Sequence, residues 1–107
     1  GDDVGVTELG DGLDLAAEYL NAKPDAERLT VASWYPTEFQ YRFRGTALPL
    51  NHYDRAGVDY VVTYRGMFER GPDAWETDVL SQFQLRTPEA VIRLRGVEYA
   101  WIYPTSP

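Results

Sequence analysis

The stretch LTVASWYP, residues 29–36, decides the fold. Val31 is β-branched and Trp34 and Tyr35 are bulky, and side chains of these kinds suit a pleated, packed surface. Pro36 ends the run because it has no backbone N–H to give to a strand ladder. We therefore predict a buried central strand whose last residues, 33–35, emerge at the edge of a sheet.

Working outward, the other predicted elements follow from hydrophobic periodicity. Apolar residues at helical spacing predict a helix at about 11–22, and Trp75, Val79 and Phe83, four residues apart, predict another at about 73–86. Between them lie a short helical turn that ends at Gly45, an edge strand over 46–50 that Pro49 interrupts, and a Val- and Tyr-rich strand over 59–64. A hairpin closes the chain, with strands at 90–94 and 97–103 and a turn at Arg95-Gly96.

Strands that alternate with helices predict an α/β fold. We expect a small three-layer αβα sandwich, with a mostly parallel sheet and a C-terminal antiparallel hairpin; a two-layer α/β sheet is the alternative. Residues 1–107 fit one soluble domain with a loose lead-in at 1–8. Because the chain starts at Gly1 rather than Met, we expect it to be a piece of a longer protein.

Composition excludes several classes of function. The chain has 10 basic and 17 acidic residues, a net charge of −7, so it lacks the basic footprint of a nucleic-acid-binding protein and would be repelled by anionic lipid headgroups. It has no cysteine, which excludes disulfides, thiolate metal sites and cysteine nucleophiles. No apolar run approaches the ~20 residues of a membrane helix.

The sequence carries no recognisable catalytic motif. His52 and Asp54 form a lone His-x-Asp, which is too little for a metal site without distant ligands. Ser33 lacks a Gly-x-Ser-x-Gly elbow and would need His52 as its base.

The carboxylate pair Asp73 and Glu76, or Glu98 with a cross-strand partner, could in principle do acid–base work. Helix-dipole and surface roles explain Asp73 and Glu76 without chemistry. We assign no catalytic, cofactor-binding or metal-ligating residue.

One edge of the predicted sheet is the best candidate for a ligand site, because ligands of open α/β sheets bind outside the carboxyl ends of parallel strands. Aromatic faces with a guanidinium there could stack on a sugar or clamp a phosphate. The alternative is that the aromatic residues pack in the core and the arginine is solvated. This predicted rim consists of Trp34, Tyr35, Asn51, His52, Tyr64 and Arg65.

Several stretches together resemble a known family. They are GLDLAAEYLNAKPDAERLTVASWYP at 12–36, the phenylalanine-containing segment that ends at Gly45, VDYVVTY at 58–64 and PEAVIRLRGVEYAWIYP at 88–104. They resemble the C-terminal soluble extracytoplasmic domain of bacterial membrane glycosyltransferases of the protein-mannosyltransferase-like type (GT-C type, family 39). The phrases ASWYP and GVEYAWIYP are the most specific parts of this resemblance, which covers most of the chain.

The resemblance implies an accessory role without catalysis. In that family the membrane helices and their loops hold the catalytic acids and take sugar from a polyprenyl-phosphate donor, and this chain contains neither. It implies a domain at the extracytoplasmic face of the cell membrane that packs on the membrane-embedded portion of the same polypeptide, or helps present acceptor or donor. The expected partners are that portion and a glycan or polyprenyl-phosphate sugar, with no nucleic acid and no cofactor. A stand-alone module that binds a saccharide or phospho-ligand is the alternative, and a small hydrolase built on Ser33 and His52 is a third.

Overall fold

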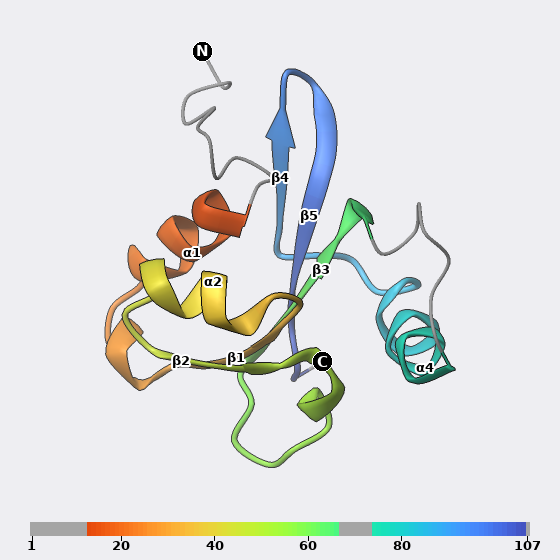
Figure 1. Ribbon diagram of the computed structural model, residues 1–107, viewed down its shortest axis with the longest axis horizontal. Helices are drawn as coiled ribbons and strands as arrows, with labels where there is room; N and C mark the ends of the chain where they lie inside the picture. The colour runs from red at the N-terminus through yellow and green to blue at the C-terminus, as the bar shows by residue number, and fades with distance from the viewer. Residues whose placement is uncertain (1–12, 67–73, 107) are drawn as a thin grey trace.

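The computed structural model describes residues 13–66 and 74–106 (Figure 1). Its helices are α1 (Leu13–Asn21), α2 (Pro36–Arg42) and α4 (Ala74–Phe83), with short 3-10 turns η1 (Ala26–Arg28) and η2 (Leu50–His52). Its strands are β1 (Thr30–Ser33), β2 (Thr46–Pro49), β3 (Tyr60–Tyr64), β4 (Ala90–Leu94) and β5 (Val97–Pro104). The predicted lead-in at 1–8 lies outside the described residues.

The five strands form one mixed sheet in the order β2-β1-β3-β5-β4. β1 is parallel to both of its neighbours, β2 and β3, whereas β5 is antiparallel to β3 and β4. This confirms three predictions: the α/β class, the parallel pairing of the strand within LTVASWYP, and the C-terminal antiparallel hairpin. The turn is also where it was predicted, since Arg95 and Gly96 have φ of 53° and 80°, the positive values of a tight two-residue hairpin turn.

The register between β1 and β3 is fixed by hydrogen bonds at the residue before β3. The backbone N–H of Asp59 donates to the Thr30 carbonyl at 2.8 Å, and the Asp59 carboxylate accepts the Thr30 N–H at 2.9 Å. The Asp59 carbonyl accepts the N–H of Thr105, just after β5, at 3.0 Å. Asp59 thus aligns the strands on both sides of β3.

Helices cover both faces of the sheet, as a three-layer sandwich requires. Tyr60 of β3 shares a carboxylate partner with Tyr19 of α1, whereas Tyr103 of β5 packs on Phe83 of α4 with ring centroids 5.6 Å apart. Tyr60 pairs with Pro104, so it points to the face opposite Tyr103 because neighbours along a strand alternate. Figure 1 shows α1 and α2 together, apart from α4.

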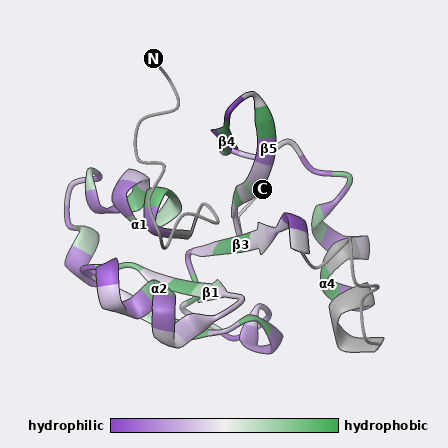
Figure 2. Ribbon diagram, turned by 45° about the horizontal axis from the view of Figure 1, so that its top comes forward, coloured by the Kyte–Doolittle hydropathy of each residue, from purple (hydrophilic) through white to green (hydrophobic). Residues whose placement is uncertain are grey.

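The core follows from this layering. Val31, Ala32, Val61 and Val62 of the two central parallel strands are fully buried, as a strand covered on both faces must be. The α1–α2 layer adds buried side chains such as Leu20. Figure 2 shows apolar stretches on β1 and β5 and a mixture of apolar and hydrophilic residues on α1.

The outer edge of the short strand β2 is hydrogen-bonded to a side chain of α2. The Gln40 side chain accepts the Ala47 N–H at 2.7 Å and donates to the Gly45 carbonyl at 2.8 Å. Gly45 is required by close packing, since a Cβ there would lie 2.3 Å from the Leu29 carbonyl oxygen. An edge strand held by a neighbouring side chain is protected from pairing with other chains.

Glu89, just before β4, joins three elements through its carboxylate. It accepts hydrogen bonds from the hydroxyls of Tyr19 at 2.6 Å and Tyr60 at 3.2 Å, and Lys23 Nζ lies 2.7 Å away. Lys23 Nζ also lies 5.3 Å from the centroid of the Tyr60 ring. Burial would raise the pKa of Glu89, but the hydrogen bonds from Lys23 and Tyr19 outweigh it and lower this pKa.

This cluster predicts a pH-dependent contribution to stability. The folded-state pKa of Glu89 is below its ordinary value of 4.5, so the contribution is present above that value and is lost as the pH falls through the folded pKa. We expect Glu89→Gln to lower the free energy of unfolding by about 1 kcal/mol at pH 7 in urea titrations, because a partly exposed cluster is screened by solvent. The difference from the unmodified protein should shrink below about pH 4.

The matched control is Asp54→Asn, which removes an exposed carboxylate from the loop before β3. It should leave stability within about 0.5 kcal/mol of the unmodified protein at both pH values. A Glu89→Gln penalty that is the same at low and neutral pH would contradict the assignment of this cluster.

Candidate functional site

Three residues of the predicted rim meet where the two central parallel strands end. Trp34 and Tyr35 follow β1, and Tyr64 is the last residue of β3. The ring centroids of Trp34 lie 4.7 Å from Tyr35 and 5.7 Å from Tyr64, and those of Tyr35 and Tyr64 are 6.2 Å apart. Parallel strands bring their carboxyl ends to one edge, so residues about 30 positions apart in the chain form one aromatic trio.

The backbone of Tyr35 turns the chain from strand into helix. Its φ of 51° and ψ of 58° are left-handed, and Pro36 follows as the first residue of α2. This conformation costs a non-glycine residue roughly 1–2 kcal/mol, which the surrounding structure must offset. The result is a tyrosine that is 47% exposed yet held against two other rings.

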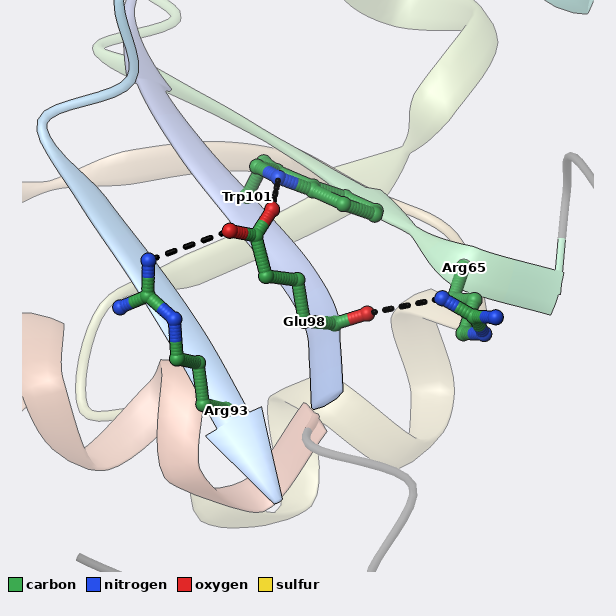
Figure 3. Close-up of polar contacts among 4 residues, drawn as sticks. All are labelled: Arg65, Arg93, Glu98 and Trp101. Atoms are coloured by element: carbon green, nitrogen blue, oxygen red, sulfur yellow. Dashed lines mark hydrogen bonds and ion pairs between the residues drawn. The ribbon is translucent and has the colours of Figure 1, made fainter. Parts of the chain in front are cut away.

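Next to the trio, Gly66 leaves little room for a side chain. A Cβ there would lie 3.3 Å from both the Trp34 and the Tyr64 rings. The preceding residue, Arg65, is directed toward β5, where its Nη1 donates to the Glu98 carbonyl at 3.5 Å (Figure 3). The arginine that was predicted for the rim therefore follows Tyr64 directly in the chain, but its guanidinium makes a hydrogen bond to β5.

The remaining two rim residues lie on a different element. Asn51 and His52 belong to η2, which follows β2 and packs against α4 and β1. Asn51 is exposed, whereas Nδ1 of the half-buried His52 is buried without a hydrogen-bond partner. The contacts gather Trp34, Tyr35 and Tyr64 into one cluster, and they leave His52 on its own helical turn.

A polar and aromatic group lies on the C-terminal hairpin (Figure 3), and sequence reasoning reached only one of its members, Glu98 with an unnamed cross-strand partner. The Glu98 carboxylate accepts the Trp101 indole N–H at 3.1 Å and lies 3.1 Å from Arg93 Nη2. A regular strand would point residues 98 and 101 to opposite faces. The register shifts between Ile92 and Arg93, so Tyr99 is an extra residue and Glu98 is turned toward the Trp101 face.

One signal for this group was present in the sequence. A two-residue turn at 95–96 makes Arg93 and Glu98 direct cross-strand neighbours of opposite charge. The participation of Trp101 depends on the register shift, which strict alternation does not predict. The group, defined as Arg93, Glu98 and Trp101, is called the hairpin cluster below.

The structure gives no support to a serine nucleophile. Ser33 is fully buried and its hydroxyl donates to the Trp34 carbonyl at 2.8 Å. A hydroxyl held in this way is not presented to a substrate or to His52 as base. The carboxylate pair Asp73/Glu76 lies outside the described side chains. Within residues 13–66 and 74–106, no group of three or more side chains is placed to hold a metal ion.

Another group of aromatic side chains, Tyr53, Phe83 and Tyr103, packs α4 against the sheet. Tyr53 lies 6.2 Å from Phe83 between ring centroids, and Phe83 also contacts Tyr103. Burial raises the pKa of both tyrosines. Tyr53 accepts a hydrogen bond from Gln82 at 3.1 Å. These contacts fix α4 on the sheet.

Comparison with protein-family models, with curated proteins and with solved structures finds no match. Among the described parts of the chain, no helix has both the length and the apolar character needed to cross a bilayer.

Proposed function

We propose that this chain is a non-catalytic extracytoplasmic accessory domain of a membrane glycosyltransferase that uses a polyprenyl-phosphate sugar. It packs on the membrane-embedded portion of the same polypeptide, or helps to present the acceptor or the lipid-linked donor. The proposal rests on the sequence resemblance and on where the resembling phrases lie in the fold.

The observation that carries the proposal is that both phrases reach the end of the sheet where β1 and β3 finish, although GVEYAWIYP continues along β3 to its other end. ASWYP forms the end of β1 and the left-handed turn at Tyr35. GVEYAWIYP consists of Gly96, the second residue of the hairpin turn, and the whole of β5. The strand between them, β3, ends in Tyr64, which contacts the Trp34 ring and pairs with Ala100. A surface built from these segments suits a docking or presenting role, and the one serine considered as a nucleophile is buried.

A transfer assay tests the accessory role. The chain, incubated with radiolabelled polyprenyl-phosphate mannose or glucose and acceptor peptide, should yield no product, because it holds none of the acids expected in the membrane loops. In the parent polypeptide, which should carry about eight or more apolar spans of ~20 residues upstream, deletion of residues 13–106 should slow transfer. Turnover by the chain alone, or a parent without such spans, would defeat the proposal.

A second candidate is a saccharide- or phospho-ligand-binding module that uses the rim. The exposed Tyr35 beside Trp34 and Tyr64 favours it, because flat aromatic faces reachable from solvent can stack on a sugar ring. Arg65 adds donors for a hydroxyl or a phosphate.

Ligand titration followed by ¹H–¹⁵N NMR tests the rim. With mannohexaose or a short-chain prenyl phosphate we expect shifts at the Trp34 indole N–H and at the Tyr64 and Arg65 amides. Tyr35→Ala should weaken binding about threefold or more, because it deletes an exposed aromatic face. Tyr41→Ala, at an 88% exposed tyrosine on α2, is the matched control and should change nothing. Unperturbed resonances at all three positions would rule the rim out.

A further inference from the structure

We propose that the outer edge of β4 is an interface for a second copy of this chain, which pairs antiparallel with it about Ile92 and joins the two sheets into one. This self-association is independent of the role in sugar transfer proposed above. The proposal rests on the unpaired backbone of β4, on the side chains of this strand and on the charges at its two ends.

The two edges of the sheet differ in their protection. The order β2-β1-β3-β5-β4 places β2 and β4 outermost. On β2, Pro49 lies within the strand and the Gln40 side chain accepts the Ala47 N–H at 2.7 Å. β4 contains no proline, and within residues 13–66 and 74–106 its backbone has hydrogen bonds to β5 alone. An edge strand with unpaired N–H and C=O groups is a template for another strand.

The side chains of β4 favour pairing with an identical strand. The sequence AVIRL, Ala90–Leu94, is apolar except for Arg93 and includes two β-branched residues. Arg93 lies 3.1 Å from the Glu98 carboxylate (Figure 3), so the one charge that would repel an identical edge is balanced within each copy. The extra residue of the register shift, Tyr99, belongs to β5, so β4 itself keeps regular alternation.

Apolar surface of β4 remains open at this edge. Ala90 and Ile92 pack against the core but are only half-buried. Directly opposite residues of antiparallel strands share a face, so pairing about Ile92 sets this side chain against its own copy, with Ala90 opposite Leu94 on either side. The pairing therefore buries a continuous apolar strip, and this burial favours association.

Charges at the ends of β4 favour the register about Ile92. This register brings Glu89, just before the strand, opposite Arg95, just after it. A twofold axis repeats the contact, so opposite charges meet at both ends of the interface. Glu89 retains its bonds within each copy, because each carboxylate oxygen can accept more than one hydrogen bond.

The neighbouring registers are less favourable. Pairing about Arg93 would set two arginines directly opposite each other, and like charges in that position are destabilising. Pairing about Val91 would set Leu94 opposite Pro88, which has no N–H to give to the ladder. The sequence of β4 thus selects one symmetric arrangement.

Disulfide trapping tests this arrangement, because the chain contains no cysteine and one introduced thiol reports on the interface. In Ile92→Cys the two Cα atoms would lie about 4.5–5.5 Å apart, within the range of a disulfide. With oxidised glutathione and ~0.5 mM protein, we expect a cross-linked dimer to form at least about tenfold faster than with Tyr41→Cys. Tyr41, on α2, is 88% exposed, so this control overestimates random collisions.

Sedimentation velocity measures the association of the unmodified chain. The mass should rise from that of a monomer toward twice that value between ~20 μM and ~1 mM. Arg95→Glu places carboxylates opposite each other at both ends and should raise the dissociation constant about threefold or more. Arg55→Glu, the same change of charge in the exposed loop before β3, should leave the constant within about twofold.

Three outcomes would overturn the proposal. The first is a mass that stays that of a monomer at ~1 mM. The second is cross-linking of Ile92→Cys no faster than that of Tyr41→Cys. The third is cross-linking of Val91→Cys as fast as that of Ile92→Cys, since residue 91 would then face its own copy. Sedimentation of the unmodified chain keeps the test decisive even if one variant folds poorly.

Discussion

The parallel pairing of β1 with β3 is the constraint on which the rest of the structure depends. The reciprocal hydrogen bonds between Thr30 and Asp59 set its register. Val61 and Val62 are then buried on opposite faces, so each face needs its own helical layer. A shift by one residue would exchange the faces of every side chain on the strand, so this register also decides which residues reach the sheet edge.

The candidate site is a direct consequence of that pairing. Two parallel strands that end together bring Trp34 and Tyr64 into contact, and the left-handed Tyr35 then turns the chain into α2 while its ring stays exposed. On the antiparallel side of β3, the register shift in the hairpin turns Glu98 toward Trp101. Both aromatic groups therefore owe their positions to local departures from regular strand and helix geometry.

Much of the fold could be predicted from sequence because it depends on period and on turn chemistry. The Val-rich strand after Asp59, and the Gly96 turn of the hairpin, have strong local signals. The site could be predicted only in part. Strand ends located the aromatic trio, but the Glu98–Trp101 contact depends on an extra residue in one strand, and the Glu89 cluster joins residues about 70 positions apart. Neither leaves a periodic pattern in the chain.

Native-state amide hydrogen exchange tests the central role of the β1–β3 pairing most directly, because it measures the free energy of opening residue by residue. The amides of Ala32 and Val62 should exchange only through global unfolding, at a higher free energy than that of Arg93 on the edge strand β4. Exchange of the β1 and β3 amides through a local opening, at a free energy no higher than that of β4, would contradict a fold organised around these two strands.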